Sequence, residues 1–402
     1  MSQYARLAVL FVVAIVAVGL IAGCGGSSIG TDSSSQAPLV TVTSATPDTQ
    51  TRVLIGYKTQ HGSAEESNVR SLRGTIHHSF TIAPVIAATV SGTAIEQLKK
   101  DPKIAYIEPD AIATASSYTD TVPSGVHQIN ADAVQNATVP NLGTGVKIAI
   151  LDSGIDYTHP DLAPVYKGGY NFVSNTTDPK DDNGHGTHVA GIVAAARNNS
   201  GIVGVAPGAS IYALKVLDAT GSGAYSAIIA GLQWCANPAN GIKVASMSLG
   251  GTTGSSALQA ACDNALKAGV LLVAAAGNDG STATIRDSVE YPARYSSVLA
   301  VGAVDQSNVR PYWSSTGAEV NIVAPGVNIY STWPGGKYQT LSGTSMACPH
   351  VTGTAALAIA SGVTGPAAIR AKLDTSATDL GTKGLDVVFG YGLDNALKAT
   401  GH

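Results

Sequence analysis

The pattern of apolar and polar positions predicts two kinds of folded unit along the chain. After residue 141, nearly continuous apolar runs, typical of strands covered on both faces, alternate with segments of helical pattern. Strands are predicted over residues 146–152, 210–218, 243–250, 270–278 and 297–304, and helices over residues 186–198, 224–237 and 255–269. This alternation predicts an α/β fold in which a doubly wound, mainly parallel sheet is flanked by helices.

A smaller unit is predicted over residues 51–118. Its pattern gives strands at residues 52–58, 83–91 and 103–110, and a short helix that ends at Pro102. We therefore expect a compact α+β module in front of the α/β domain, which takes residues 119–402. The segment that joins them, "AIATASSYTDTVPSG", consists mostly of small residues and favours proteolysis.

The N-terminus has the pattern of a targeting segment. Arg6 precedes an apolar run over residues 7–21, which is short for a membrane span and has the length of a secretory signal core. The run ends in "LIAGC", which resembles the lipobox of bacterial lipoproteins. That resemblance implies removal of residues 1–23 and a lipid on Cys24; an ordinary signal peptide with a chance cysteine is the alternative. Residues 24–50, rich in Gly, Ser and Thr, are expected to form a flexible tether.

These features predict a secreted or extracytoplasmic protein, either free or held by a lipid at the outer face of a bacterial membrane. With 45% hydrophobic and 12% charged residues, the chain has the composition of a packed globular protein, which excludes a mainly disordered one. The net charge of −4 and the lack of a long Lys/Arg cluster exclude nucleic acid as a partner, because basic side chains must neutralise its backbone.

Two polar residues, Asp152 and His185, stand where such a sheet forms its ligand crevice, outside the carboxyl ends of the strands, and Ser345 supplies a third group of matching chemistry. Asp152 directly follows a predicted strand, His185 opens a predicted helix, and Ser345 in "GTSMACPH" precedes an apolar helical run. Each has an ordinary structural reading, as a turn residue, a loop histidine and a helix cap. Together they supply a nucleophile, a base that takes its proton, and a carboxylate that orients the base.

The strings around these residues resemble the subtilisin-like serine peptidases. "DSGID", "HGTHVAG" and "GTSMACPHV" occur in that family's order, with "GVAPGA", "SMSLGG" and "AAAGND" between them, so that the resemblance covers residues 119–402. It implies a serine endopeptidase that forms an acyl-enzyme through Asp152, His185 and Ser345. It also implies that Asn278 donates a hydrogen bond to the oxyanion, together with the backbone N–H of Ser345.

The resemblance also implies how protein and peptide substrates bind. An extended substrate would pair with the main chain of residues 248–251. The implied substrate-binding residues are Ser248, Leu249, Gly250, Gly277 and Glu290. Glu290 would lie at the floor of the pocket for the side chain before the scissile bond, where the family often has a small residue. With Asp279 near the rim, we expect basic side chains to be accepted beside aromatic and large apolar ones.

The smaller unit resembles the inhibitory propeptide of the family, a ferredoxin-like module that assists folding and blocks the active site of its own chain. The resemblance puts the self-cleavage between Tyr118 and Thr119, in an autoprocessed zymogen that matures to a monomer. A permanent accessory domain is the alternative. An aromatic Tyr118 at the cleaved bond argues against a pocket restricted to basic side chains.

Calcium is the cofactor that the resemblance implies, since a hard cation takes several oxygen ligands. Its implied ligands are the carboxylates of Asp120 and Asp161, the side chain of Asn198, and the backbone oxygens of Ala196, Ser200 and Ile202. A solvated turn in "ARNNSGI" is the alternative.

The cysteines leave one pairing open. Cys235 and Cys262 fall on consecutive predicted helices, so a Cys235–Cys262 disulfide and two free thiols are both compatible with the sequence. Cys348 is expected to be a small buried residue and not a second nucleophile, because it has no basic partner.

Two other functions remain for comparison. A catalytically silent surface binding protein of the same family needs none of Asp152, His185, Asn278 and Ser345, so their presence favours the enzyme. A lipase or esterase would carry Gly-x-Ser-x-Gly around its nucleophile, and "GTSMA" lacks the second glycine.

Overall fold

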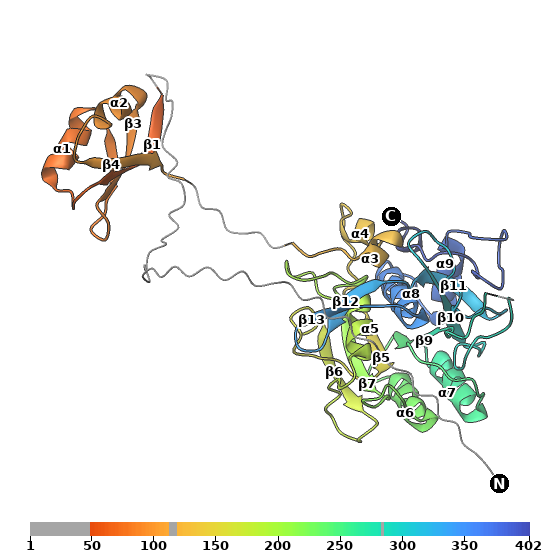
Figure 1. Cartoon of the computed structure of the whole chain (residues 1–402). Helices are drawn as coiled ribbons and strands as arrows, with labels where there is room; N and C mark the ends of the chain where they lie inside the picture. The colour runs from red at the N-terminus through yellow and green to blue at the C-terminus, as the bar shows by residue number, and fades with distance from the viewer. Residues whose placement is uncertain (1–48, 112–118, 283–284) are drawn as a thin grey trace, which may run out of the picture. The chain divides into compact units, whose positions relative to one another are not determined.

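The computed structural model describes residues 49–111, 119–282 and 285–402, which fall into two compact units divided between residues 111 and 119 (Figure 1). The predicted signal peptide, Cys24, most of the tether and Tyr118 lie outside the described residues. Within the described ranges, no helix has both the length and the apolar character that a membrane span requires.

The first unit is a four-stranded antiparallel sheet, in the order β2-β3-β1-β4, with two helices. Its βαββαβ chain order is the ferredoxin-like arrangement. Val53, Ile55, Ile86 and Ile95 form the centre of its core. The elements are β1 (Gln50–Tyr57), α1 (Ser63–Ser71), β2 (Thr75–Ser79), β3 (Val85–Ser91), α2 (Gly92–Leu98) and β4 (Ile104–Pro109).

The second unit is built on a seven-stranded sheet in which every neighbouring pair is parallel. The order is β11-β10-β9-β8-β5-β7-β6, so the predicted α/β fold is confirmed. The strands are β5 (Lys147–Asp152), β6 (Tyr166–Asn171), β7 (Ser210–Lys215), β8 (Val244–Met247), β9 (Leu271–Ala275), β10 (Val298–Val304) and β11 (Val320–Pro325). Because β7 and β8 lie on opposite sides of β5, the strand order reverses at β5, and this switch point opens a crevice at the carboxyl end of β5.

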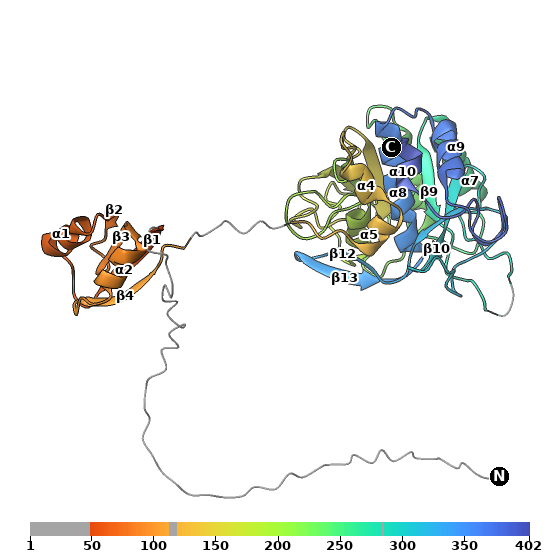
Figure 2. The same ribbon diagram turned by 90° about the horizontal axis from the view of Figure 1, so that it is seen from above.

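Helices cover both faces of this sheet. Figure 1 shows α6 and α7 on one side and α8 on the other, and Figure 2 shows α8 running beside β9 and β10. Helix α8 contacts β8, β9, β10 and β11, and nearly all of its residues are buried. The helices are α3 (Ser124–Gln128), α4 (Ala131–Gln135), α5 (His185–Ala194), α6 (Tyr225–Ala236), α7 (Ser256–Lys267), α8 (Thr344–Ala360), α9 (Pro366–Ser376) and α10 (Ala396–Thr400).

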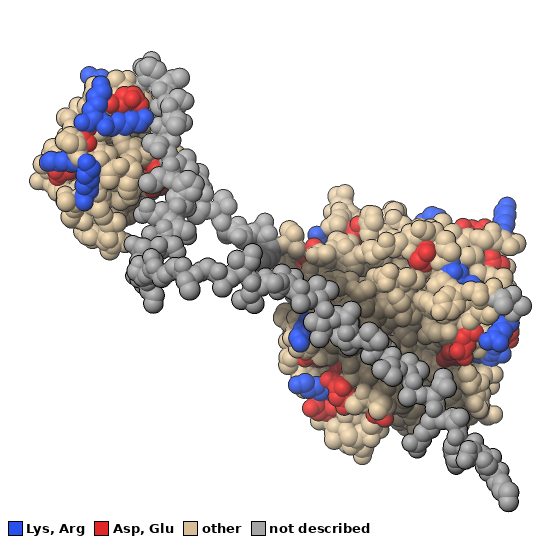
Figure 3. All heavy atoms as spheres, viewed as in Figure 1, with Lys and Arg blue, Asp and Glu red and all other residues tan. Residues whose placement is uncertain are grey.

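An antiparallel pair, β12 (Ile329–Trp333) and β13 (Lys337–Leu341), leads into α8. On the face of the second unit drawn in Figure 3, basic side chains lie singly or beside acidic ones and form no broad basic patch.

Candidate active site

Asp152 and His185 form a hydrogen-bonded pair at the switch point of the sheet. Strand β5 ends at Asp152, which is fully buried, and α5 begins at His185. The Nδ1 atom of His185 lies 2.7 Å from Oδ1 of Asp152. A carboxylate only accepts, so the imidazole donates from Nδ1 and its Nε2 is the nitrogen left to take a proton. The same Asp152 oxygen also accepts from the backbone N–H of Ser153.

Charge around His185 favours its protonated form. Burial alone lowers the pKa of His185, but the charge of Asp152, its hydrogen bond and the charge of Asp181 more than offset burial. The pKa is therefore raised above its ordinary value. A base in this environment holds a proton well once it has taken one from a nucleophile.

Ser345 lies in the first turn of α8 but does not cap the helix, because the capping position belongs to Gly343. Its hydroxyl donates to the backbone oxygen of Ser248 at 3.2 Å. Pro349 has no N–H for the carbonyl of Ser345 four residues earlier, and that carbonyl instead accepts from the Ser248 hydroxyl at 2.8 Å. The two serines thus fix α8 against the segment after β8. Within the described residues, the Ser345 hydroxyl has no hydrogen bond to His185.

His185 and Ser345 line one cavity of about 510 Å³. The predicted substrate segment, residues 248–250, lines this cavity together with residues 217 and 220–223 after β7. The structure therefore brings together the serine and histidine that are 160 positions apart in the sequence. Residues of this cavity are Asn183, His185, Leu217, Thr220, Gly221, Ser222, Gly223, Tyr225, Ile228, Ser248, Leu249, Gly250 and Ser345.

Asn278 follows β9 and is held at the start of α8. Its side-chain oxygen accepts from the backbone N–H and the hydroxyl of Thr344, at 3.0 and 3.1 Å. Because an amide side chain accepts only through its oxygen, the NH₂ group of Asn278 remains as a donor next to the turn that carries Ser345.

Glu290 lies in a crevice between two glycine-containing segments. Its carboxylate packs against Gly250 and Gly277, where a Cβ on either glycine would overlap it. Its Oε1 accepts from the backbone N–H of Asn278 at 3.3 Å. Burial raises the pKa of Glu290, and the charge of Asp279 adds to this. Glu290 and Asp279 also line a second cavity of about 310 Å³, and within the described residues no basic side chain forms an ion pair with Glu290.

The three segments predicted to hold calcium converge on one another. The carboxylate of Asp120 accepts from the backbone N–H groups of Asn198 and Ser200, both at 3.1 Å. Asp161 is fully buried, and its Oδ2 accepts from the N–H of Ile202 and the hydroxyl of Tyr338. Its other oxygen has one weak contact, 3.4 Å to the NH₂ group of Asn198.

This oxygen-rich donor set fits a hard cation. Asp161 is a buried carboxylate that pairs with no basic side chain in the described part of the chain, and a cation would neutralise it. Among the described residues no group of three or more His, Cys, Asp or Glu side chains suits a metal, so carbonyl oxygens such as those of Ala196 and Ser200 would have to complete the shell. Asn198 would have to turn its amide, because its NH₂ group now faces Asp161.

Comparison with known proteins decides the family. A model described as the subtilase family matches residues 143–392, a range that includes Asp152, His185 and Asn278, together with Ser345. This chain belongs to the subtilase family. It is therefore a serine endopeptidase, a hydrolase of peptide bonds.

Relatives of this subtilase match it over most of both chains. It is 45% identical over 357 residues to subtilisin E of Bacillus subtilis (strain 168), covering 87% of this chain and 91% of the relative. It is 43% identical over 373 residues to an alkaline protease of Shouchella clausii, covering 89% and 94%. A thermostable alkaline protease of Halalkalibacterium halodurans is 46% identical over 325 residues, covering 80% and 85%. Each match is longer than residues 119–402 and so extends beyond the second unit.

The structure decides between the two alternatives that the sequence left open for the cysteines. In this subtilase Cys235, Cys262 and Cys348 are all free and buried, so the structure has no Cys235–Cys262 disulfide. Cys235 and Cys262 are members of the main hydrophobic core, where each thiol packs among apolar side chains below its own helix. Burial raises the pKa of Cys262 to about 12 and that of Cys348 to about 11, so both thiols stay protonated and unreactive at neutral pH.

Sequence reasoning missed several residues that support the site. Thr344 orients Asn278, and Ser248, predicted only as a substrate-binding residue, also donates its hydroxyl to the carbonyl of Ser345. Lys215 and Asp181 are buried charges beside the Asp152 and His185 segments. A signal for Lys215 was present, since a lysine inside an otherwise apolar strand is rarely buried without a partner.

Proposed function

We propose that the chain is a secreted serine endopeptidase in which Ser345 is the nucleophile, His185 the general base and Asp152 the residue that orients the base. The observation that carries this proposal is the 2.7 Å contact of His185 with buried Asp152, with the histidine in the same cavity as Ser345. A catalytically silent binding protein would not need a buried carboxylate paired with a histidine.

The reaction follows from the hydrogen bonds. The Ser345 hydroxyl leaves the Ser248 carbonyl, gives its proton to Nε2 of His185 and attacks the substrate carbonyl carbon. The imidazolium stays paired with Asp152 and then donates that proton to the leaving amine, as the C–N bond breaks and an acyl-enzyme remains. A water molecule then gives a proton to His185 and attacks the ester carbon, and His185 passes that proton to the Ser345 oxygen as the acyl–oxygen bond breaks.

The negative charge on the carbonyl oxygen is stabilised by donors that are already in place. The NH₂ group of Asn278 cannot turn away without losing both contacts of its oxygen with Thr344. The backbone N–H of Ser345 is the second donor, at a helix N-terminus whose dipole favours negative charge.

The substrate lies along residues 248–250 and pairs with their main chain, which gives affinity for many sequences. Glu290, which packs between Gly250 and Gly277, puts a carboxylate at the floor of the pocket for the side chain that precedes the scissile bond. Mixed specificity follows, in which basic side chains are accepted beside aromatic and large apolar ones. Tethering of the chain to itself makes the Tyr118 bond cleavable even where Tyr is not the best fit.

The first unit and the segment ahead of it also have proposed functions. The first unit acts as an inhibitory and folding-assisting propeptide that is removed by cleavage between Tyr118 and Thr119, and the product is extracellular. Its ferredoxin-like fold and the extension of the relatives' similarity beyond the second unit support this proposal. The segment ahead of it directs export, either with a lipid on Cys24 or by simple removal of the signal.

Calcium is proposed as a structural cofactor at Asp120, Asp161 and Asn198. With the carbonyl oxygens of Ala196, Ser200 and Ile202, these residues would hold the cation, which supplies charge neutralisation between three chain segments and takes no part in the reaction. The support is the buried Asp161 carboxylate, which lacks a cationic partner in the described residues.

The function is tested by self-processing. Wild-type precursor should lose residues up to 118 during expression in a host that lacks other proteases, and Ser345→Ala should accumulate as the full precursor. Ser361→Ala, a substitution of a helix-terminal serine at the far end of α8, is the matched control and should mature normally. Complete maturation of the Ser345→Ala variant would contradict the proposal.

A further inference from the structure

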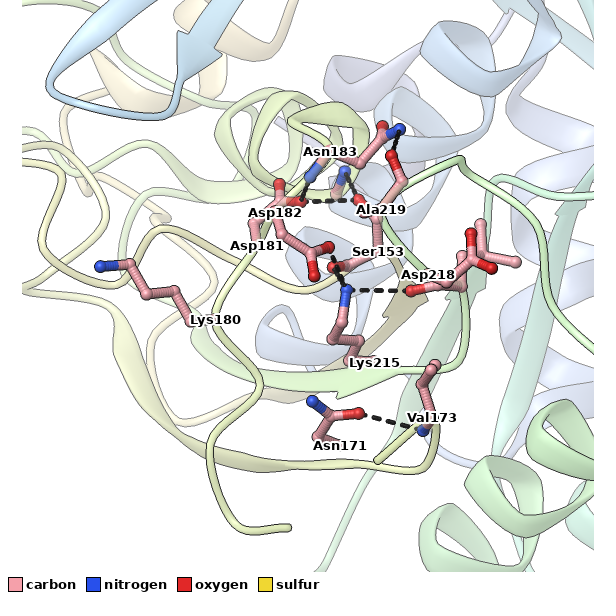
Figure 4. Close-up of polar contacts among 12 residues, drawn as sticks. Ser153, Asn171, Val173, Lys180, Asp181, Asp182, Asn183, Lys215, Asp218 and Ala219 are labelled. Atoms are coloured by element: carbon pink, nitrogen blue, oxygen red, sulfur yellow. Dashed lines mark hydrogen bonds and ion pairs between the residues drawn. The ribbon is translucent and has the colours of Figure 1, made fainter. Parts of the chain in front are cut away.

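Lys215 is a buried charge that the proposed reaction does not use. It ends β7 and is 3% exposed. An ammonium group in such a place is costly unless each of its protons has an acceptor. Its Nζ donates to the backbone oxygens of Ser153 and Leu217, at 2.7 and 3.0 Å, and to Oδ1 of Asp182 at 2.5 Å. Figure 4 shows the Lys215 side chain directed toward Ser153 and Asp182.

The three acceptors come from three segments that form the active site. Ser153 directly follows Asp152, and Asp182 precedes His185 by three residues. Leu217 lines the cavity that holds His185 and Ser345. In the parallel pairing of β5 with β7, Lys215 is the partner of Asp152, so both residues lie at the carboxyl ends of their strands, next to the active site.

Asp181 is a second charged residue that connects the segments of Ser153 and His185. The carboxylate of Asp181 accepts from the hydroxyl of Ser153 at 2.9 Å and from the N–H groups of Gly184 and Thr187, both at 2.9 Å. The Ser153 hydroxyl in turn accepts from the N–H of Gly186 at 2.9 Å. Ser153 is therefore held through its side chain by the start of α5 and through its carbonyl by Lys215.

We propose that Lys215 is a positioning residue that sets His185 against Asp152, by holding Asp182 and the carbonyl of Ser153 with one ammonium group. It touches neither the substrate nor the reacting atoms. This inference rests on the proposed function, because it assigns Lys215 to the same histidine and aspartate. A side chain that only stabilised the fold would affect the unfolding temperature, whereas a positioning residue affects turnover of enzyme that is folded.

The first test compares Lys215→Met with Lys147→Met. Lys147 is at the opposite end of β5, where its Nζ contacts the backbone oxygen of Asn240 at 3.1 Å, far from the cavity in strand register. We expect Lys215→Met to lower kcat for a peptide substrate at least tenfold with KM within twofold of wild type, after correction for active enzyme by active-site titration. Lys147→Met should leave kcat within twofold.

A second pair of variants decides the matter even if Lys215→Met does not mature. Asp182 is half-exposed, with 55% of its side chain accessible, so its replacement disturbs the fold less than removal of the buried lysine does. Asp182→Ala removes the acceptor and should lower kcat at least threefold. Asp182→Asn keeps an oxygen that accepts from Lys215 and should restore at least half of the wild-type kcat. The double variant Lys215→Met/Asp182→Ala should be no slower than Lys215→Met, because the two residues act as one unit.

Three results of the first test would overturn the inference, and an Asp182→Ala kcat within twofold of wild type would overturn it in the second. The three are a Lys215→Met kcat within twofold of wild type, an equal loss in Lys147→Met, or a change confined to KM. The last would show that Lys215 acts on the cavity wall through Leu217. These results leave the proposed function intact if wild-type enzyme hydrolyses the peptide, whereas an inactive wild type would remove the proposed function itself.

Discussion

Asn278 and Thr344 are joined by two hydrogen bonds, from the N–H and the hydroxyl of Thr344 to the one side-chain oxygen of Asn278. The contact fixes the amide and points its NH₂ group at the turn that carries Ser345. A donor fixed in this way need not reorganise when charge develops on the substrate, which is the condition for strong transition-state stabilisation.

Removal of this donor should therefore slow the chemical step without weakening ground-state binding. Asn278→Ala should lower kcat by roughly 10²–10³ and leave KM nearly unchanged. Thr344→Val, which removes only one of the two contacts, should lose far less. Steady-state kinetics on one peptide substrate measures both, and an Asn278→Ala loss that appears in KM alone would refute the assignment.

Glu290 is expected to shape side-chain preference. Its carboxylate has no basic partner in the described residues and is partly desolvated between Gly250 and Gly277, so a Lys or Arg side chain of a substrate gains a pairing there. The ratio of kcat/KM for Lys or Arg against Phe or Leu should fall in Glu290→Gln and in Glu290→Gly. Asp287→Asn, an exposed acidic residue of the second cavity, serves as the charge control.

A ratio that stays within about twofold in both Glu290 variants corresponds to less than ~0.5 kcal/mol of differential transition-state binding. That result would remove Glu290 from the pocket.

Calcium removal should destabilise the mature enzyme. A ligand that binds only the folded state stabilises it by ~2.7 kcal/mol at a hundredfold excess over its Kd. A chelator should lower Tm in wild type, and Asp161→Ala should abolish most of that sensitivity together with part of the starting stability. Asp178→Ala, which removes an exposed contact with Tyr157, should keep the full response. Equal chelator sensitivity in Asp161→Ala and wild type would count against this site.

The sequence predicted the central strands and the main helices because their apolar patterns are long and unbroken. It missed α1 and β2, since the helix buries only Val69 and the strand is mostly exposed, and neither therefore shows a periodic pattern. The edge strand β6, "YKGGYN", was missed because it is mostly half-buried and its adjacent glycines leave no apolar alternation. Helix α8 starts at Thr344, seven residues ahead of the apolar run that begins at residue 351. The sequence did not indicate this early start, because a proline is usual at the start of a helix and Pro349 lies inside this one.

The sequence predicted the main residues of the candidate site but not the contacts that hold them. Asp152, His185, Asn278 and Ser345 lie in strings with a strong family resemblance, and geometry adds the contacts between segments that no string contains. The exchange between Ser248 and Ser345 depends on a carbonyl freed by Pro349, and the three acceptors of Lys215 come from separate segments. The cysteines show a limit of sequence reasoning, because two neighbouring helices need not bring their core-facing thiols into contact.

Stability should depend on pH through two buried histidines. Burial lowers the pKa of His188 and of His350 to about 4. Such a group binds more protons when unfolded, so its contribution is complete above the unfolded pKa near 6.5 and is lost as pH falls toward 4. Each histidine accounts for about 3 kcal/mol over that range. The pKa of buried Asp394, raised to about 7, gives the opposite slope, so variants must be compared with wild type.

Urea unfolding of inhibitor-blocked mature enzyme between pH 7 and pH 4.5 measures this slope. His350→Asn keeps a donor for the backbone oxygen of Met346, which the histidine contacts at 2.9 Å, and should flatten the loss of stability on acidification. An unchanged slope in the His350 variant would contradict the prediction.

The central claim is that Ser345 is a nucleophile made reactive by His185 and Asp152. The most direct measurement treats mature enzyme with a fluorophosphonate and maps the adduct by mass spectrometry after digestion. The account predicts one adduct, on the peptide that contains Ser345, and at least a thousandfold slower labelling after a His185→Ala substitution in enzyme matured by added wild type. Labelling of another residue, or equal rates with and without the His185 imidazole, would contradict it.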